Sequence, residues 1–404
     1  IDTSWISSKG KYNSLFSEKF ADYIGVAYGT TVANGTLALH LALMALGIGK
    51  GDEVIVPSFT YIASANAVRY TGADVVFADS NEKSWQLDPD DIEHRITNRT
   101  KAIMPVHLYG HPCEMDSIIK IAKKHRLFVI EDCAEAIGSE YRGKKVGSFG
   151  DISAFSFFGN KTITCGEGGM VVTNDKTLYE RSVHLKGQGL ATHREYWHDI
   201  IGYNYRMTNI AAAIGLAQLE QVESFIGRKI EIANLYSEGL KNLPIKIHKA
   251  TGDVRHTYWM VSIICDEIDR RDELRDYLKS EGVETRPTFY PVHTMPMYSE
   301  KYQKQYSQEE LIKINKVFSL FDSVEDSINK FEINKNNFYI SIKDNICILT
   351  IKLDTKELPK NKISDTIIFE IPLIELKLEK NNSNMSSINR NLKYLKIENN
   401  ISIE

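Results

Sequence analysis

The sequence lacks several features that would each assign it to a specialised class of protein. No apolar run approaches the roughly 20 residues that a membrane-spanning helix needs, and no signal peptide is visible. The formal net charge is only -4, so neither nucleic acid nor an anionic membrane surface is indicated as a partner. The 5 cysteines are scattered without the spacing of a metal site. We therefore expect a cytoplasmic protein with reduced thiols, no metal, and no membrane or nucleic-acid partner.

The composition is that of an ordinary globular protein, and the chain is long enough for two or three domains. The chain has 404 residues, of which 43% are apolar and 25% charged. Strands are expected at 53–57, 74–78, 101–106 and 127–131, and they alternate with helices at 63–70, 88–96 and 117–125. This alternation predicts an α/β fold with a mainly parallel sheet covered by helices on both faces, whose ligands bind at the carboxyl ends of the strands.

Towards the C-terminus the pattern changes twice. A long helix at 219–243 is expected to lead into a small α+β domain, with strands at 256–265 and 283–290 and a helix at 270–281. After Ser307 the sequence is rich in Asn, Lys and Ile, and its short alternating stretches read either as β-hairpins or as a low-complexity tail without stable order. We predict a large domain at 1–225, a small domain at 226–306 and an atypical, β-rich tail at 307–404.

One stretch, from Ser153 to Gly169, carries the strongest indication of chemistry. Its single lysine, Lys161, stands on a short crossing between two apolar strands, with Ser156 before it and a glycine-rich turn after it. A lysine between buried segments is desolvated, which favours the neutral amine that Schiff-base chemistry requires. A solvated loop lysine is the better interpretation of an isolated lysine, so the neighbouring motifs decide between the two.

Further polar and aromatic residues stand at predicted strand ends or at a helix start. Asn34-Gly35-Thr36 opens an apolar helix, where free N–H groups, a glycine and a hydroxyl suit a phosphate; simple N-capping is the alternative. Tyr61 follows a strand and could stack on a flat ring or belong to the core. His107 and Asp132 follow two later strands. Their shared placement with Lys161 predicts one site at one edge of the sheet.

These residue types match what a pyridoxal phosphate site requires. A lysine amine must form a Schiff base and carry a proton, and a carboxylate must keep the pyridine nitrogen protonated. N–H groups and hydroxyls must hold the phosphate, and an aromatic ring should cover one face of the cofactor. The sequence offers these groups in order along one α/β sheet: Gly35 with Thr36, Tyr61, Asp132, Ser156 and Lys161. The set is more specific than any single member.

Several long stretches resemble one family of enzymes. They are NGTLALHLAL, PSFTYIASANAV, VIEDCAEAIGS, FGDISAFSFFGNKTITCGEGGMVVTND, GYNYRMTNIAAAIGLAQLE and ETRPTFYPVHTMPMYSEKYQK. Residues 1–306 are similar to the nucleotide-sugar aminotransferases of the DegT/DnrJ/StrS family, which implies the type I aminotransferase fold. GNKTIT followed by GEGG is similar to the members that make GDP-perosamine. The resemblance implies amino transfer from L-glutamate to C4 of GDP-4-keto-6-deoxy-D-mannose, giving GDP-perosamine and 2-oxoglutarate for a surface polysaccharide such as an O-antigen.

The resemblance also implies roles for single residues in binding pyridoxal 5'-phosphate. Lys161 would form the Schiff base, and Asp132 would pair with the pyridinium nitrogen. Glu135 falls where the family places a polar residue near the ring hydroxyl. Tyr61 would stack on the ring, and the phosphate would be held by Gly35, Thr36 and Ser156.

Other residues carried over from the family concern the dimer and the substrate. Asn204 and Arg206 lie in a segment that resembles the one reaching the phosphate from a neighbouring subunit, which implies a homodimer; which of the two makes the contact stays open. The remaining candidates either line the nucleotide-sugar pocket or have interface or structural roles: His184, Lys186, Arg286 and His293.

The sequence departs from the family at both ends, and alternatives to this activity stay open. The N-terminal segment is expected to be shortened, and the tail after Tyr306 stands where the family closes its small domain, as a gene fusion, frameshift or assembly error would produce. One alternative is a UDP- or dTDP-linked 4-keto sugar as substrate. Another is an inactive fusion product or non-catalytic regulator on the same scaffold. A third is a sugar dehydratase, but these relatives typically carry histidine in place of Lys161.

Overall fold

The computed structural model describes residues 5–243, 245–265, 271–303, 338–343, 346–352 and 366–372. Contacts within the chain define two compact units. The first comprises residues 1–231, 249–260 and 289–314, and the second comprises 232–248, 261–288 and 315–404. The domain limits expected from the sequence, at residues 225 and 306, stay a prediction.

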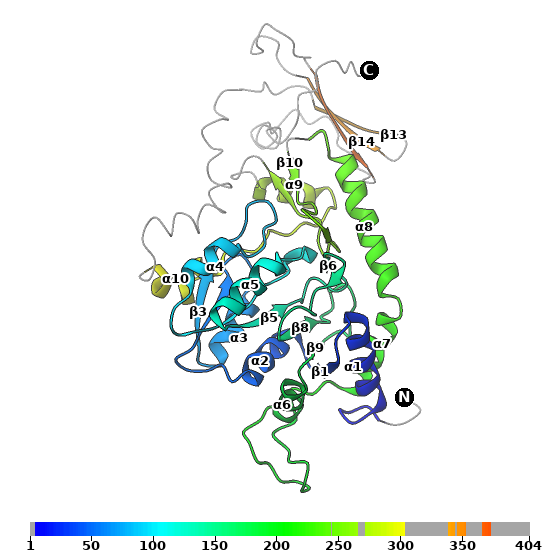
Figure 1. Cartoon of the computed structure of the whole chain (residues 1–404). Helices are drawn as coiled ribbons and strands as arrows, with labels where there is room; N and C mark the ends of the chain where they lie inside the picture. The colour runs from blue at the N-terminus through cyan, green and yellow to red at the C-terminus, as the bar shows by residue number, and fades with distance from the viewer. Residues whose placement is uncertain are drawn as a thin grey trace. The chain divides into compact units, whose positions relative to one another are not determined.

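The first unit is built on a seven-stranded sheet whose strands lie in the order β1-β9-β8-β5-β4-β2-β3 (Figure 1). Five neighbouring strands are parallel: β8 (Ile152–Ser156), β5 (Phe128–Asp132), β4 (Thr100–Ile103), β2 (Glu53–Pro57) and β3 (Asp74–Ala78). The other two pair antiparallel at one side of the sheet: β9 (Gly169–Thr173) on β8, and β1 (Tyr28–Val32) on β9. The mainly parallel sheet predicted from the alternating pattern is confirmed.

Helices separate most of these strands along the chain and cover the sheet on both faces. Those of the first unit are α1 (Lys11–Ile24), α2 (Gly35–Ala45), α3 (Ala63–Tyr70), α4 (Pro89–Arg95), α5 (Met115–His125), α6 (Lys176–Lys186), α7 (Asn209–Leu219), the start of α8 (Val222–Gly239) and α10 (Pro296–Gln303). Short 3₁₀ turns lie at Leu108–Gly110 and Val292–Thr294. A small sheet joins β6 (Glu140–Tyr141) to β7 (Lys144–Lys145) and β11 (Val254–Arg255).

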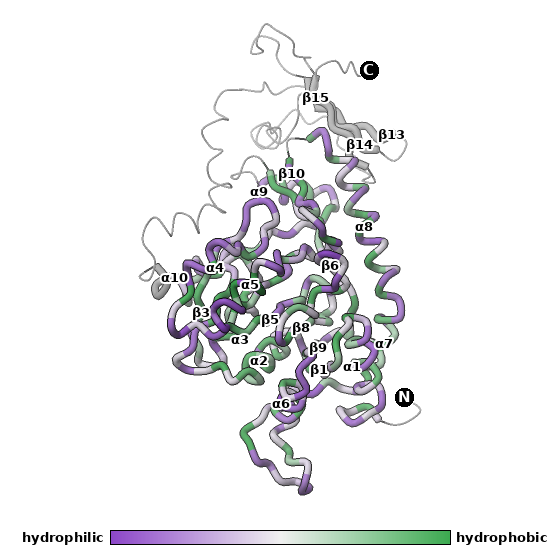
Figure 2. Tube along the Cα trace, viewed as in Figure 1, coloured by the Kyte–Doolittle hydropathy of each residue, from purple (hydrophilic) through white to green (hydrophobic). Residues whose placement is uncertain are grey.

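Alternate residues of the central strands face different cores, as the period of two in a strand requires. In β9, Val171 packs in the core that contains α2, whereas Met170 and Val172 pack in the core that contains α1 and α7. Helix α2 is apolar on most faces, which is why it lies buried on the sheet (Figure 2). The buried sheet therefore holds the strand ends, where ligands are expected, in a rigid frame.

The second unit contains β10 (Ile245–Ile247) paired with β12 (Ile263–Cys265), and α9 (Arg271–Ser280). The strand expected at 256–265 forms only at its end, and the strand expected at 283–290 does not form. The first expectation holds only for Ile263–Cys265 and the second was wrong, because a strand requires a hydrogen-bonding neighbour, which sequence pattern does not reveal. In the tail, β13 (Phe338–Lys343), β14 (Ile346–Lys352) and β15 (Thr366–Pro372) form an antiparallel sheet. The sequence left β-hairpins and a low-complexity tail open as alternatives, and the limits of the tail stay a prediction.

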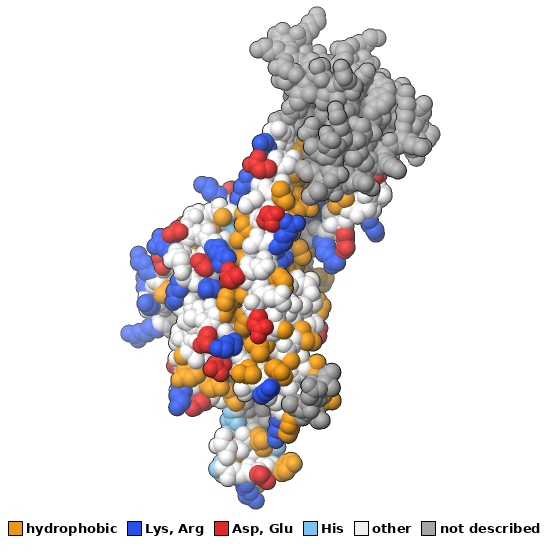
Figure 3. Space-filling model, turned by 90° about the vertical axis from the view of Figure 1, so that its right-hand side faces the viewer, with side chains coloured by type: hydrophobic (Ala, Val, Ile, Leu, Met, Phe, Trp, Pro, Cys, Tyr) orange, Lys and Arg blue, Asp and Glu red, His pale blue; other side chains and the backbone are white. Residues whose placement is uncertain are grey.

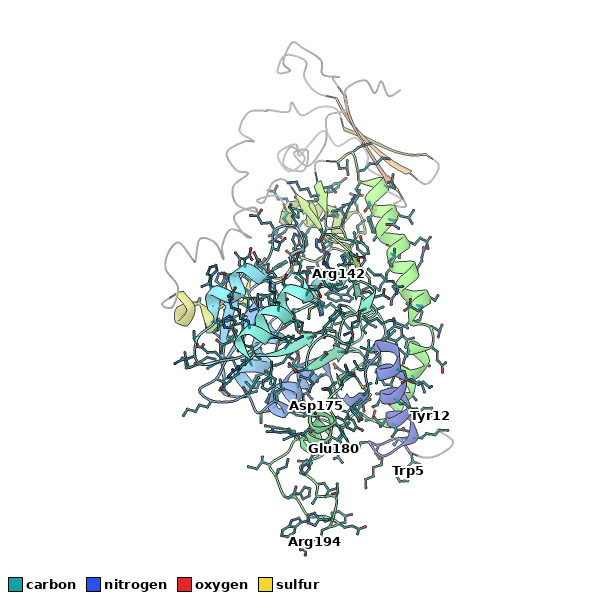
Figure 4. All side chains as sticks on the ribbon, in the orientation of Figure 1. Trp5, Tyr12, Arg142, Asp175, Glu180 and Arg194 are labelled. Atoms are coloured by element: carbon teal, nitrogen blue, oxygen red, sulfur yellow. The ribbon has the colours of Figure 1, made fainter. Side chains whose placement is uncertain are left out.

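An arm projects from the first unit between α6 and α7. Two isolated bridges, Gly187 with Asn204 and Leu190 with His198, hold its two sides together. Figure 4 shows Arg194 at its far end, away from the sheet. Among the helices within the described ranges, none combines the length and apolar character that crossing a membrane requires.

Candidate active site

Three of the predicted site residues lie at neighbouring strand ends. Asp132 ends β5 and Ser156 ends the adjacent parallel strand β8. Lys161 stands in the crossing from β8 to β9, as its flanking strands predicted. These strands are adjacent in the sheet, so the three side chains share one edge of it.

Asp132 is a buried carboxylate with neutral hydrogen-bond donors. Ser64 Oγ donates to Asp132 Oδ2 at 2.7 Å, and the N–H of Ala134 donates to Oδ1 at 3.1 Å. Burial raises the pKa of the Asp132 carboxyl, while the bond from Ser64 and the charge of Lys161 act in the opposite direction. Because these two donors are neutral, a cationic group bound beside Asp132 would stabilise its charged form.

Glu135 and Lys161 form a close ion pair. Lys161 Nζ lies 3.5 Å from Glu135 Oε1, with side chains only 12% and 5% exposed. The N–H of Tyr109 donates to Glu135 Oε2 at 2.9 Å. Burial raises the pKa of the Glu135 carboxyl, and the charge of Lys161 opposes that rise. On another side, Lys161 Nζ lies 3.9 Å from the centroid of the Trp259 ring.

The N-terminus of α2 meets Ser156. The side chain of Asn34 caps the helix by accepting the N–H of Leu37 at 3.0 Å. A Cβ on Gly35 would lie 2.6 Å from Ser156 Cβ and 2.9 Å from its Oγ, so only glycine leaves this space open. Thr36 is half-buried in the first turn. The structure thus brings together the three residues expected to hold a phosphate, at a helix end whose free N–H groups favour anions.

Asn204 and Arg206 lie beside the same helix start in the same chain. The N–H of Ala33 donates to the carbonyl of Tyr205 at 2.9 Å. Arg206 Nε and a terminal nitrogen of its guanidinium both lie 3.2 Å from Asn204 Oδ1, to which they donate. Whether these residues serve the phosphate of this chain or of a partner stays a prediction.

Tyr61 lies among aromatic rings rather than alone. Its side chain is 55% exposed, and its ring is tilted against Phe289 with the centroids 5.5 Å apart. Phe289 stacks on Tyr109, and Tyr109 stacks on Trp259. The aromatic row therefore runs from Tyr61 to the lysine, and the exposed ring of Tyr61 is available to a ligand.

The four residues predicted to line the nucleotide-sugar pocket each contact different partners. His184 Nε2 lies 2.7 Å from Asp199 Oδ1. Lys186 is half-buried and donates to the carbonyl of Thr31 at 2.6 Å; desolvation and the neighbouring Arg206 lower its pKa to about 8. His293 is buried, with Nδ1 2.6 Å from Ser58 Oγ. Arg286 belongs to the second unit, where it pairs with Glu284 at 2.8 Å.

His107 supports the site from within the protein. Its Nδ1 accepts the N–H of Cys113 at 3.0 Å, so Nε2 carries the proton and donates to Glu131 Oε2 at 3.0 Å. Burial alone would raise the pKa of Glu131, but the bond from His107 and several backbone N–H groups bring it below its ordinary value. His107, Glu131 and Cys133 offer ligand atoms within 4.8 Å of one another. Because N–H donors already occupy both Glu131 oxygens, this is a hydrogen-bond network rather than a metal centre.

Comparison with known proteins assigns the chain to a family. The sequence model of the DegT/DnrJ/EryC1/StrS aminotransferase family matches residues 1–317. This chain belongs to that family.

Relatives and a solved structure agree with the assignment. The chain is 66% identical to GDP-perosamine synthase of Escherichia coli O157:H7 over 311 residues, which are 77% of this chain and 85% of the relative. GDP-perosamine synthase of Vibrio cholerae is 50% identical over 306 residues, 75% of this chain and 83% of the relative. The PLP form of a putative sugar aminotransferase from Streptococcus pneumoniae covers 80% of this chain and 93% of its own, with a TM-score of 0.71 and 25% identity. The protein is an aminotransferase with the type I PLP-dependent fold, as expected.

The site residues fit the family's cofactor on their own chemistry. Asp132 is a buried carboxylate that a ring cation would complement, and glycine keeps the space between the α2 N-terminus and Ser156 open for a phosphate. Lys161 is close enough to Glu135 for both to face one ligand.

Three residues around the site were missed by reasoning from the sequence. Ser64 holds Asp132 from the first turn of the predicted helix at 63–70, where nothing in the sequence marks it. Tyr109 stands two positions after His107 and was assigned no role of its own. Trp259 comes from a segment predicted as a strand of the small domain, yet it belongs to the first unit. No local signal could have connected it with Lys161.

Proposed function

We propose that this aminotransferase transfers the amino group of L-glutamate to C4 of GDP-4-keto-6-deoxy-D-mannose, forming GDP-perosamine and 2-oxoglutarate with pyridoxal 5'-phosphate as cofactor. The observation that carries the proposal is the pair of Lys161 with the buried Glu135, beside Asp132 at one sheet edge. A lysine that reacts with a carbonyl and a carboxylate that faces a ring nitrogen are what transamination requires.

Each residue of the site has a task in this proposal. When bound, the cofactor supplies an electron-withdrawing ring. Asp132, held by Ser64, keeps a proton on the ring nitrogen. The α2 N-terminus, Thr36 and Ser156 bind the phosphate. Lys161 Nζ binds the cofactor, accepts the proton that leaves Cα of glutamate and later delivers a proton to C4 of the sugar.

Glu135 and Tyr61 orient the ring in this proposal. Glu135 is buried and held by the N–H of Tyr109, so it can accept a hydrogen bond from the ring hydroxyl. Tyr61 is exposed at the end of the aromatic row, where it can cover one face of the ring. The nucleotide sugar would then enter from the remaining side.

The choice of nucleotide and sugar is supported by the relatives named GDP-perosamine synthase. A pocket discriminates small groups by only ~1–3 kcal/mol each, so UDP- and dTDP-linked 4-keto sugars are the alternatives to test. The presence of lysine at position 161 favours transamination over the dehydratase reaction.

We also propose a homodimer with shared active sites. Tyr196 and Ile201 on the arm are 93% and 91% exposed, which is unusual for large apolar side chains. Leu15 on α1 and Ile210 and Ile214 on α7 are exposed as well. Figure 3, which looks from that side, shows hydrophobic side chains among the charged ones. A second copy of the chain would cover them.

The proposal is tested with purified protein and three substrates. Wild type should show the near-visible absorption band of bound pyridoxal phosphate, and Lys161→Ala should lose it, whereas the exposed Lys176→Ala should keep it. A coupled assay of 2-oxoglutarate with glutamate and GDP-, UDP- or dTDP-linked 4-keto sugar should give the highest kcat/KM with GDP. A wild type that binds no added cofactor would contradict the enzyme assignment; a preference for another nucleotide would contradict only the substrate.

A further inference from the structure

Trp259 lies against the lysine at the centre of the proposed site. Lys161 Nζ is 3.9 Å from the centroid of the Trp259 ring, and the same nitrogen is 3.5 Å from Glu135 Oε1. The face of an indole attracts an ammonium more strongly than that of any other aromatic side chain. The lysine amine is therefore held from two sides, by a carboxylate and by an aromatic face.

Several contacts fix the Trp259 ring in this place. Its indole N–H donates to the carbonyl of Asn160, the residue next to Lys161, at 2.9 Å. Its backbone N–H donates to the carbonyl of Tyr109 at 3.0 Å, and the two rings stack with planes 11° apart. Lys229 Nζ donates to the carbonyl of Trp259 at 3.3 Å. The ring has little freedom to turn away from the lysine.

The turn at Tyr109 contacts both groups that lie beside Lys161, namely Trp259 and Glu135. Tyr109 has φ of 56°, a left-handed conformation that is strained for a non-glycine residue. The next residue is Gly110, with φ of 95°, and a Cβ there would lie 2.9 Å from the backbone nitrogen of Tyr258. Through this close approach Tyr109 reaches Trp259, and through its own N–H it reaches Glu135. The strained turn thus holds both partners of Lys161.

We propose that Trp259 is a positioning residue that holds the Lys161 ammonium whenever the lysine is not bonded to the cofactor. The inference rests on the proposed function, in which the amine alternates between a bonded and a free state. A free lysine side chain has many rotamers, and ordering it costs free energy. Trp259 and Glu135 restrict the chain to one place, so that the amine is present for the next proton transfer.

The test measures the reactivity of Lys161 in the full chain freed of cofactor. Trp259→Leu removes the aromatic face, and Trp259→Phe keeps a smaller one. At one fixed pH, with acetic anhydride and peptide mass spectrometry, we expect Lys161 of Trp259→Leu to be acetylated about three to ten times faster than in wild type, because its ammonium loses a partner. Trp259→Phe should lie in between. In the loaded enzyme, Trp259→Leu should lower kcat with little change in the KM for glutamate.

Trp85 offers a matched control. It is as buried as Trp259, at 7% exposure each, and it packs edge-on against the same Tyr109 ring. Trp85→Leu should leave acetylation of Lys161 near the wild-type rate. A wild-type rate in Trp259→Leu, or equal rates in the Leu and Phe variants, overturns the inference. If circular dichroism shows that Trp259→Leu is unfolded, the Phe variant decides, and a rate equal to wild type overturns it.

The proposed function and this inference fail in different experiments. A wild type that binds no pyridoxal phosphate contradicts the function. The acetylation comparison is made without cofactor, so its outcome bears on Trp259 alone.

Discussion

Ser64 and Asp132 stand 68 residues apart in the sequence, yet Ser64 Oγ donates a 2.7 Å hydrogen bond to Asp132 Oδ2 within the buried end of β5. The bond leaves Asp132 Oδ1 with the N–H of Ala134 and orients the carboxylate at the sheet edge. It ties α3, which follows β2, to the neighbouring part of the sheet. The proposed site thus depends on contacts between elements as well as on the residues that react.

Replacing Asp132 by Asn should separate cofactor binding from turnover. Asparagine keeps a hydrogen-bond acceptor but has no charge to hold a proton on the ring nitrogen. We expect kcat to fall by at least about a hundredfold while the cofactor still binds. Ser64→Ala, which removes one bond to a charged group, should cost less, about tenfold. Stopped-flow and steady-state kinetics measure both. Wild-type turnover in Asp132→Asn would contradict the assigned role.

A methyl group at position 35 should weaken binding of the cofactor phosphate. Its Cβ would lie 2.6 Å from Ser156 Cβ, so either the helix start or the strand end must move. We expect Gly35→Ala to raise the dissociation constant for pyridoxal phosphate by at least about tenfold, measured by equilibrium dialysis. Gly227→Ala is the control, because a Cβ there meets nothing within 4 Å and alanine is the better helix former. Equal affinity in wild type and Gly35→Ala would argue against a phosphate at this helix end.

Acid should destabilise the protein through His111. Its Nδ1 donates to the carbonyl of Pro112 and its Nε2 accepts the N–H of Thr251, so protonation of Nε2 would set two donors against each other. Burial lowers the pKa of His111 from 6.5 to about 4. The unfolded chain therefore binds more protons in this window, and the free energy of unfolding falls as the pH falls from 6.5 to 4, by at most about 3 kcal/mol from this group.

Urea unfolding at several pH values between 7 and 4 measures this dependence. In His111→Gln the slope should be smaller than in wild type, although the variant is less stable at pH 7. The exposed His94→Gln should keep the wild-type slope. An unchanged slope in His111→Gln would show that other groups control the acid sensitivity.

A charge on the arm should weaken the proposed homodimer. Burying an Ile side chain at an interface contributes about 1.5–3 kcal/mol, and a carboxylate in its place must be desolvated. Ile201→Glu is therefore expected to raise the dimer dissociation constant by at least about tenfold in sedimentation velocity. Thr192→Glu, at an exposed polar position of the same arm, serves as the control. A wild type that sediments as a monomer at micromolar concentration would disprove the dimer itself.

The main sheet and several parts of the site could be predicted because they depend on short-range sequence patterns. Strands such as Glu53–Pro57 and Asp74–Ala78 are short apolar runs between helices, and this pattern alone implies a parallel sheet. Asp132 and Lys161 could be placed at one edge because they come after such runs, and Ser156 was noted because it stands five positions before Lys161. The strand expected at 283–290 failed because pattern does not reveal whether a neighbouring strand is present.

Local sequence was therefore sufficient for the alternating strands and helices of the main sheet and for the residue types at their ends, since periodicity and strand-end chemistry are encoded within a few positions. Which distant residues contact them was decided only by the tertiary structure. Ser64 reaches Asp132, and Trp259 reaches Lys161 across almost a hundred positions, because the packed sheet and the strained turn at Tyr109 bring distant segments together. Contacts of this kind depend on three-dimensional packing, which short-range pattern does not contain.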